Sequence, residues 1–196
     1  MTLRKQPKPK PIPDAQALYE IAVRALARRA RSTGELRALL QRRKADVQDI
    51  DTVLARLHEH GYLDDARFAR SFVAGRIDNE RHGSRRVRRD LAARRVHPEL
   101  VQQAVRAGYE GVEERKLLRD YLRRKLRLTR PPEKPSAVAS LYRRLLHAGF
   151  ASDTIVKELR ALLRGGSFRG GATIDPEKWQ EWVESLSDLP EPEEGS

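Results

Sequence analysis

Cysteine is absent from this chain of 196 residues. Its absence excludes a disulfide framework, a thiolate nucleophile and cysteine-ligated zinc. No apolar run approaches the length that a membrane-spanning helix needs, and no apolar segment typical of a secretory signal follows the N-terminus. We therefore expect a cytoplasmic protein that has no membrane partner.

Aromatic residues are also few, at 6% of the chain, whereas charged residues make up 35%. Such a composition leaves too little apolar side chain for one large core, although it suits an elongated helical protein with several thin cores. Leu, Ala, Arg and Glu favour helices and are abundant here, and β-branched residues, which favour strands, are sparse. The composition therefore predicts an all-α fold.

Positive charge dominates the sequence, with 40 Lys and Arg against 28 Asp and Glu and a net charge of +12. The acids are concentrated near the C-terminal end, because residues 175–196 contain eight acids and one base, which leaves a charge of +19 on the rest. A body that basic favours a polyanionic partner, such as nucleic acid, an acidic protein surface or anionic lipid. The alternative is that the arginines only solvate helix surfaces.

Apolar residues recur at helical spacing in three successive groups, each of which predicts three short helices. Matching positions of the first two groups lie 51 residues apart, namely Leu36, Leu40 and Ile50 with Val87, Leu91 and Val101. Matching positions of the third group follow 54 residues later, namely Leu141, Leu145, Phe150 and Ile155. A helical period of about 50 residues indicates stacked repeats. We predict three three-helix repeats, at residues 15–63, 64–109 and 110–164, that form an elongated, curved array.

Short polar residues and glycines mark the expected helix ends. Ser32 and Glu35 have the capping-box spacing, in which the hydroxyl and the carboxylate each satisfy a free backbone N–H. Glycines at Gly61 and Gly108 are expected just past helix ends, because glycine adopts the left-handed conformation without steric cost. Pro98 is expected at a first helical position. The other expected N-terminal caps are Asp46, Asp64 or Asp65, Ser84 and Ser152.

The two ends of the chain differ in composition from the repeats. Residues 1–14 are basic and proline-rich, which predicts an extended, disordered arm. Residues 165–196 begin as a glycine-rich linker and continue as an acidic tail, in which Trp179, Trp182, Val183 and Leu186 predict a short helix. We hypothesise that this tail docks on the chain's own basic surface and competes with the partner there. Removal of residues 172–196 should then tighten partner binding.

No constellation of residues points to catalysis, or to a bound cofactor or metal. Adjacent Asp64 and Asp65 point in different directions at a helix start, where capping explains them. His58 and His60 are two residues apart on a helix and do not face the same way, so no zinc-ligand set emerges. The glycines of residues 165–171 lack the following Lys-Ser/Thr of a phosphate-binding loop. We therefore expect a protein that is not an enzyme.

Three stretches between residues 18 and 163 form a recognisable pattern. They read, in order, "ALARRARSTGELRALL", "GYLDDARFARSF" and "HGSRRVRRDL". The first resembles the R-R-x-R-S-x-x-E-L opening of the RecX family, which regulates the RecA recombinase. The second is similar to that family's G-(Y/L)-(I/L)-D-D-x-x-F-A junction, and the third to its G-x-x-(R/K)-(I/V/L)-x-x-x-L helix. The basic arm and the Trp-containing tail have no counterpart in this pattern.

The resemblance implies tandem three-helix repeats and a regulatory protein without enzymatic activity. RecX-like proteins bind the RecA filament on single-stranded DNA, lie along its groove across neighbouring protomers, and slow strand exchange and ATP hydrolysis. Some members also bind DNA directly. By resemblance we expect inhibition of RecA ATPase, strand exchange and filament assembly, with a place in DNA repair, homologous recombination and the SOS response. We also expect a monomer.

The candidate binding residues for the filament or DNA are basic and recur in each repeat. Arginine presents a planar fork that suits carboxylate or phosphate, and stacked repeats would align these clusters into one basic stripe. For any single arginine, the alternative is a solvated helix face that covers the core. The candidates are Arg28, Arg29, Arg31, Arg42, Arg43, Lys44, Arg85, Arg86, Arg88, Arg89, Arg94, Arg95, Arg123, Arg124 and Lys125.

Two other classes of binding protein fit the charge. A general DNA-binding protein would use the Arg-rich helix of residues 84–95, because each three-helix unit resembles a helix-turn-helix in outline. That helix has few Asn or Gln to contact bases, which predicts phosphate contacts and a steep salt dependence. An RNA- or ribosome-binding protein has the right charge, but no aromatic RNA module is present. A preference for RecA-coated over bare DNA strands would separate the first two classes.

Overall fold

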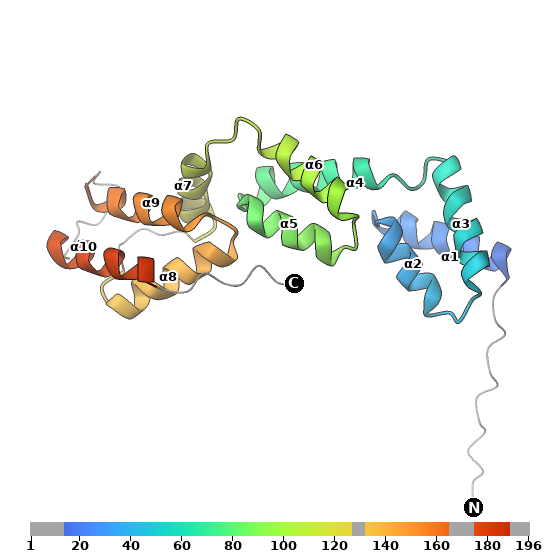
Figure 1. Ribbon diagram of the computed structural model, residues 1–196, viewed down its shortest axis with the longest axis horizontal. Coiled ribbons are helices and arrows are strands. Elements are labelled where there is room, and N and C mark those ends of the chain that lie inside the picture. Colours follow the sequence, from blue (N-terminus) through green and yellow to red (C-terminus); the bar gives the residue numbers. More distant parts are fainter. Residues whose placement is uncertain (1–13, 127–131, 165–174, 189–196) are drawn as a thin grey trace, which may run out of the picture. The chain divides into compact units, whose positions relative to one another are not determined.

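A computed structural model of the chain describes residues 14–126, 132–164 and 175–188 (Figure 1). Within these ranges the chain forms ten α-helices, one π-helical turn and one 3-10 turn, and it contains no strand. The prediction of an all-α fold built from three-helix repeats is therefore confirmed. The expected basic arm, the glycine-rich linker and the end of the acidic tail lie outside the described residues. No described helix is long and apolar enough to cross a bilayer.

The first repeat contains α1 (Ala15–Arg28), α2 (Thr33–Gln41) and α3 (Val47–Glu59). Aspartate side chains cap the N-termini of two of these helices. Asp14 accepts a hydrogen bond from Ala17 N, and Asp46 accepts one from Gln48 N, both at 2.8 Å. Gly61 follows α3 with φ of +69°, as predicted for a helix stop. The core is formed by one apolar stripe from each helix: Leu18, Ala22, Leu36, Leu40, Ile50, Val53, Leu54 and Leu57.

The second repeat contains α4 (Asp65–Gly75), α5 (Ser84–Ala93) and α6 (Pro98–Tyr109), with the π-helical turn η1 (Arg76–Glu80) extending α4. Pro98 occupies the first position of α6, as predicted. The prediction that Gly108 lies past the end of this helix is wrong. Gly108 lies inside α6, where a Cβ would come within 2.4 Å of Val73, and Gly111 instead adopts the left-handed conformation at φ +73°. Glycine at residue 108 thus permits close packing of α6 against α4.

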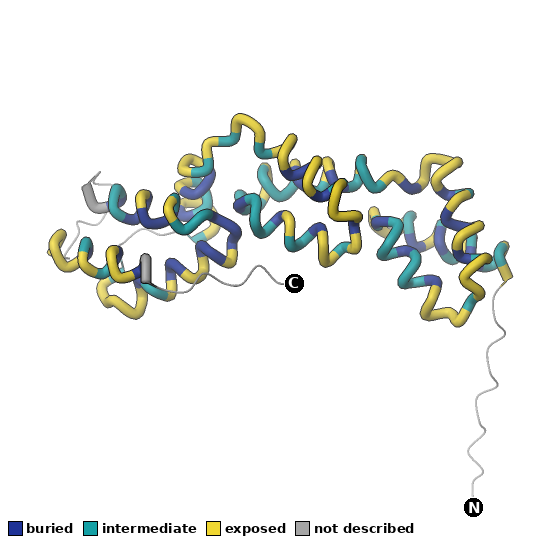
Figure 2. Tube along the Cα trace, in the orientation of Figure 1, coloured by how far each residue is buried: buried dark blue, intermediate teal, exposed yellow. Residues whose placement is uncertain are grey.

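The third repeat contains α7 (Glu114–Arg124), α8 (Pro135–His147) and α9 (Ser152–Arg164). Two further segments, α10 (Pro176–Glu184) and the 3-10 turn η2 (Ser185–Asp188), pack against α9. The apolar side chains of this repeat and of α10 form one buried cluster, which includes Leu118, Leu122, Leu141, Tyr142, Leu145, Phe150, Ile155, Leu159, Trp179 and Val183. Figure 2 colours the buried residues of these helices dark blue.

The predicted acidic helix is present, but its aromatic face has a different contact from the one we expected. Trp179 is buried, and its indole Nε1 donates a hydrogen bond to the carbonyl of Leu159 at 3.0 Å. Glu184 at the end of α10 lies 3.7 Å from the Arg160 guanidinium. The face proposed to cover the basic clusters therefore covers α9 instead, and it extends the core of the third repeat.

Two expected serine caps are wrong for a shared reason. The helices α5 and α9 begin at Ser84 and Ser152, so each serine is the first helical residue and not the residue before it. The first helical hydrogen bonds of these helices are accepted by the carbonyls of Gly83 and Ala151. The Ser152 hydroxyl is within hydrogen-bond distance of the Tyr142 hydroxyl, at 2.7 Å.

The chain divides into two compact units that do not coincide with the repeats. The first unit combines Met1–Phe68 with Arg94–His97, and the second combines Ala69–Ala93 with Pro98–Ser196. The turn between α5 and α6, which belongs to the second repeat by sequence, therefore packs with the first repeat. The contact between the first repeat and this turn of the second repeat therefore lies wholly inside the first unit.

Candidate functional site

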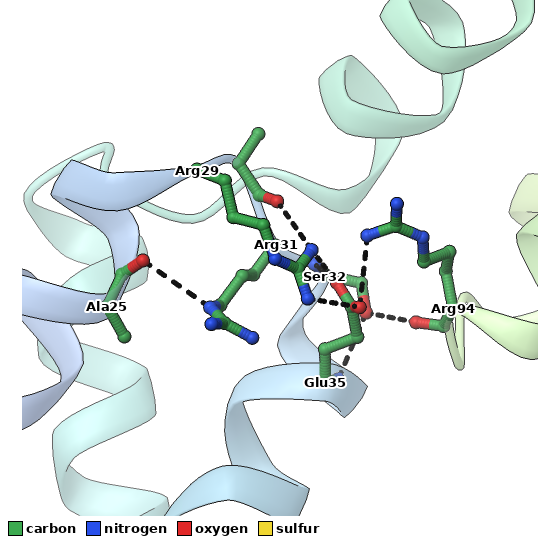
Figure 3. Close-up of polar contacts among 7 residues, drawn as sticks. Ala25, Arg29, Arg31, Ser32, Glu35 and Arg94 are labelled. Carbon is green, nitrogen blue, oxygen red and sulfur yellow. Dashed lines mark hydrogen bonds and ion pairs between the residues drawn. The ribbon is translucent and has the colours of Figure 1, made fainter.

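Three candidate arginines of the first unit gather around one carboxylate, that of Glu35 on α2 (Figure 3). Arg29 donates to Glu35 from both terminal nitrogens, at 3.0 and 3.3 Å, and Arg94 donates to the same carboxylate at 3.1 Å. Arg31 lies beside them and donates from Nε to the carbonyl of Ala25 at 3.4 Å. The bidentate pair with Arg29 is the geometry that holds a guanidinium in one orientation. The cluster carries three positive charges against one negative charge.

Local sequence explains why Glu35 points toward these arginines. The Ser32 hydroxyl accepts from Glu35 N at 3.0 Å, and the Glu35 carboxylate accepts from Ser32 N at 3.3 Å, so the predicted capping box is confirmed. Ser32 is fully buried, and its hydroxyl donates to the carbonyl of Arg94 in the turn before α6. The cap of α2 therefore also joins the first repeat to the second.

The electrostatics of this cluster favour a charged Glu35. Burial opposes its ionisation, but the hydrogen bond from Arg29 and the positive charge of Arg94 outweigh that effect and lower the pKa of Glu35. Its side chain is only 14% exposed. The pKa of Arg31 is also lowered, first by burial and then by the charge of Arg29. Two of the three arginines are thus committed to a structural carboxylate.

Asp65 contributes to the same region in a way that the sequence did not reveal. Its carboxylate accepts from the backbone N of Thr33 at 2.8 Å and from the Thr33 hydroxyl at 3.1 Å. The neighbouring Asp64 caps α4 by accepting from Arg67 N at 2.8 Å. Of the two adjacent aspartates, one therefore caps its own helix and the other holds the start of α2, 32 residues earlier in the chain.

A second junction, inside the second unit, joins the start of α5 to the turn between α8 and α9. Gly83 N donates to the carbonyl of Ala148 at 2.8 Å, and Arg85 N donates to the carbonyl of Gly149 at 3.3 Å. Candidate residues Arg86 and Arg89 both donate to the carbonyl of His147, at 3.4 and 3.1 Å. These arginines therefore help to hold the third repeat against the second.

The arginines of α5 are partly neutralised by an acid on the same helix. Asp90 lies 2.9 Å from Arg86 Nε and 3.6 Å from Arg76, which is on η1. Val87 and Leu91 are buried, as predicted, and Arg88 is exposed on the opposite side of the helix. Of the four candidate arginines on this helix, Arg88 alone is both exposed and without a hydrogen bond or ion pair to another described residue, and the role of the four in binding stays a prediction.

A buried acid in the third repeat neutralises two arginines that were not among the candidates. Glu158 on α9 is 3% exposed and lies 3.3 Å from Arg115 and 3.7 Å from Arg119, both on α7. Candidate Arg123 lies 2.6 Å from Asp120 one turn before it. The sequence spacing does not predict the ion pairs of Glu158, because Arg115 and Arg119 lie about 40 residues before it. The remaining candidates of α7, Arg124 and Lys125, are exposed.

The candidates therefore fall into two groups. Those tied to carboxylates or carbonyls of the chain are Arg29, Arg31, Arg86, Arg89, Arg94 and Arg123, and Arg85 has contacts as well. Those that are exposed and form no hydrogen bond or ion pair through the side chain with another described residue are Arg28, Arg42, Arg43, Lys44, Arg88, Arg95, Arg124 and Lys125. The second group is the better candidate for contacts with a partner. Its alignment into one stripe stays a prediction.

A polar cluster beside the second junction contains a half-buried histidine. His82 is 14% exposed, and its Nε2 lies 3.6 Å from Glu80. Burial lowers the pKa of His82, and the nearby charge of Arg86 lowers it further, against the opposing effect of Glu80. The carbonyl of His82 accepts from the Tyr109 hydroxyl at 2.7 Å, and burial raises the pKa of that tyrosine. In the described ranges, no three side chains of the metal-ligating types gather here or elsewhere.

Comparison with known proteins gives the repeats an identity. A sequence model described as "RecX, first three-helix domain" matches residues 19–57, and one described as "RecX, second three-helix domain" matches residues 64–105. These ranges lie within the first two repeats. The crystal structure of RecX from Lactobacillus salivarius aligns with 77% of this chain and 97% of its own length, with a TM-score of 0.61 and 17% identity. That likeness supports the same helical fold.

Curated relatives agree with these matches over part of their length. Regulatory protein RecX of Escherichia fergusonii is 37% identical over 99 residues, which cover 45% of this chain and 59% of the relative. Regulatory protein RecX of Vibrio vulnificus is 34% identical over 92 residues, which cover 47% of this chain and 60% of the relative. The chain thus matches about three fifths of the length of these relatives. The two repeats matched in order and the shared helical fold support membership of the RecX family.

Proposed function

We propose that this protein regulates the RecA recombinase by binding the RecA filament on single-stranded DNA and inhibiting its ATPase, strand exchange and assembly. Membership of a family of regulatory proteins supports the regulatory part of the proposal. The observation that carries the binding part is the group of eight exposed bases that lack carboxylate partners among the described residues. Together with a charge of +19 outside residues 175–196, these bases suit a nucleoprotein surface that is rich in phosphate and acidic side chains.

The proposed mechanism is non-covalent. A monomer would lie along the filament groove and contact successive RecA protomers through different repeats. Because each repeat carries exposed bases of its own, several weak charge contacts would add to a high overall affinity. Bound across protomers, the chain would resist the movements that ATP hydrolysis and strand exchange require. No step of this mechanism needs a cofactor or an enzymatic activity of the chain itself.

The test is ATP hydrolysis by RecA already assembled on saturating single-stranded DNA, titrated with this protein. We expect inhibition at far fewer copies than there are RecA protomers, unrelieved by additional bare DNA. Loss of inhibition on addition of bare DNA would contradict the proposal, because it would mean that the chain acts by binding free strands.

General DNA binding through phosphate contacts is the second candidate function. It is favoured by the exposed arginines Arg88 and Arg124 and by Lys125, which have no ion pair with a described residue. Such binding would weaken steeply with salt, by about one unit of log affinity per unit of log salt for each phosphate contact. Equal affinity for bare and RecA-coated strands at the same salt would support this candidate over filament regulation.

A further inference from the structure

The turn between the second and third helix contains a residue with positive φ at the matching position of all three repeats. Lys44 and Arg95 both have φ of +58°, and Gly149 has φ of +92°. These residues are separated by 51 and 54 positions, which are the offsets of the apolar repeat. A positive φ is uncommon for Lys or Arg, so its recurrence at matched positions indicates that the turn has one required shape.

In the second and third repeats, this turn contacts the start of a helix of the preceding repeat. The carbonyl of Arg94 accepts from the Ser32 hydroxyl, and the carbonyl of Ala148, at the matching position, accepts from Gly83 N at 2.8 Å. Ser32 and Gly83 are themselves 51 residues apart and immediately precede α2 and α5. The junction is therefore a repeated contact in which a turn accepts the first turn of a helix.

The turn of the first repeat has the same parts, but no preceding repeat exists in the described chain to occupy it. Arg43 and Lys44 match Arg94 and Arg95 in position and in charge. Together with Arg42 they are exposed, and their side chains form no ion pair or hydrogen bond with another described residue. Val47, directly after this turn, is 60% exposed, which makes it one of two large exposed apolar side chains in the described ranges.

We propose that the turn of residues 42–46, with Val47, is a docking surface for the first turn of a helix on the RecA protein of the filament, and not a phosphate contact. The proposal rests on the proposed function. The chain's own first junction, in which residues 32–35 contact residues 94 and 95, indicates which residues the partner segment should have. It would carry a small hydroxyl residue before the helix, a glycine opposite Lys44 in the place of Gly34, and a carboxylate that pairs with Arg43 as Glu35 pairs with Arg94.

A second copy of this chain fits the surface poorly. Its own segment of residues 32–35 is already engaged with Arg94. The matching segment of the third repeat would be the start of α8, but that helix begins at Pro135, two residues before the position that matches Gly83. The additional residues would fill the space of the junction, and Lys134 would bring positive charge toward Arg43. An acidic helix start on another protein suits the surface better.

The experiment compares two variants with equal changes of charge, Arg42→Glu/Arg43→Glu and Arg124→Glu/Lys125→Glu. All four residues are exposed, and helical circular dichroism verifies that both variants keep the fold. Affinity is measured for preassembled RecA filaments and for bare single-stranded DNA of the same length, at the same salt. A third variant, Val47→Ser, removes exposed apolar surface without a change of charge.

We expect the two charge variants to lose affinity for bare DNA by similar factors, because both lower the net charge of the chain by the same amount and so weaken its long-range attraction to DNA. On filaments, the Arg42/Arg43 variant should lose at least about tenfold more than the Arg124/Lys125 variant, as expected for loss of a specific charge pair. Val47→Ser should weaken filament binding several-fold and leave DNA binding unchanged.

Equal losses for both charge variants on both targets, with no effect of Val47→Ser, would overturn the docking surface and would mean that residues 42–44 contact phosphate. That result leaves filament regulation standing if the wild-type chain still prefers filaments to bare DNA. A wild-type chain without that preference would overturn the proposed function, and the docking surface with it.

Discussion

The two junctions between repeats share one geometry but use different chemistry. At the first, side chains make the contact: the Ser32 hydroxyl donates to a carbonyl, and Glu35 pairs with Arg94 at 3.1 Å. At the second, backbone donors are added: Gly83 N and Arg85 N donate to the carbonyls of Ala148 and Gly149. The side chains of Arg86 and Arg89 also donate there, to the carbonyl of His147. A contact that recurs with the repeat can therefore be built with backbone donors or without them.

Glycine stands on one side of the first junction and on both sides of the second. At the first it is on the helix, where a Cβ on Gly34 would come within 2.4 Å of the Arg95 carbonyl oxygen. At the second it is also in the turn, where a Cβ on Gly149 would come within 2.2 Å of Arg86 N. The backbone junction leaves no room for a side chain in the turn, whereas the side-chain junction accommodates Arg95 there because Gly34 faces it. Four predictions test this difference.

Gly149→Ala should have the largest effect. The new Cβ would meet backbone atoms that cannot rotate away, and alanine is also unfavourable at φ +92°, so we expect a loss of about 3 kcal/mol in the free energy of unfolding. Urea unfolding followed by tryptophan fluorescence measures it, because both tryptophans, Trp179 and Trp182, lie in the same unit as Gly149.

Gly61→Ala is the matched control, because Gly61 has a similar positive φ but no atom within 4 Å of its added Cβ. That variant should lose only about 1 kcal/mol, the cost of the backbone conformation alone. Equal losses at residues 61 and 149 would mean that the backbone approach at the second junction is not tight.

Glu35→Gln should have the next largest effect, because it leaves Arg29 and Arg94 without their carboxylate. We expect a loss of about 2 kcal/mol at pH 7, measured by urea unfolding followed by circular dichroism. The folded protein lowers the pKa of Glu35, so its stabilising contribution is present above the pKa of the unfolded chain and is lost as pH falls through the lower folded value. The gap between wild type and variant should therefore close in acid.

Glu20→Gln is the control for that prediction, since Glu20 and Arg24 form an exposed pair at 3.7 Å. Exposed pairs contribute little, so this variant should match the wild type within about 0.5 kcal/mol at every pH. A gap between wild type and Glu35→Gln that persists below the folded pKa would show that the loss comes from packing and not from charge.

His82 should make the second junction sensitive to milder acid than the first. Burial lowers its pKa in the folded chain, so the unfolded chain binds more protons, and stability is lost as pH falls below the ordinary histidine value of about 6.5. Replacement by Gln should remove part of the stability change between pH 7.5 and pH 5.5, as measured by the midpoint of thermal unfolding. His97→Gln, at an exposed position, should retain the wild-type change. An unaltered pH dependence in His82→Gln would place the titrating group elsewhere.

Much of this architecture could be predicted from the sequence, because it follows from local patterns. The apolar period gave the repeats and their offsets, and the spacing of Ser32 and Glu35 gave a capping box that the structure contains. What could not be predicted are contacts over long separations. Thr33 meets Asp65 and Arg115 meets Glu158 through packing of whole helices, which no spacing in the sequence encodes.

The same limit explains the uneven outcome for the candidate arginines. A count of charges does not distinguish Arg86 from Arg88, although Arg86 forms an ion pair with Asp90 and Arg88 is exposed. The acids that pair with basic residues were visible one turn away in the case of Asp90 and Asp120, so part of this sorting was available from helical spacing. Glu35 was recognised as a cap, but its ion pair with Arg94 depends on the turn of the following repeat.

Arg95→Gly should have the smallest effect on the free energy of unfolding. It removes a side chain from the turn of the first junction, whereas Gly149→Ala adds one to the turn of the second. Glycine relieves the cost of a positive φ at Arg95, but it also increases the freedom of the unfolded chain, and the two effects are similar in size. We therefore expect a change within about 0.5 kcal/mol in urea unfolding, because the carbonyl contacts of the first junction come from Arg94 and do not need the Arg95 side chain. A loss well above that value would mean that the Cβ of Arg95, packed against Gly34, holds the junction as firmly as the backbone hydrogen bonds hold the second one. The first junction would then depend on the Cβ of Arg95 as well as on the polar contacts of Ser32 and Glu35.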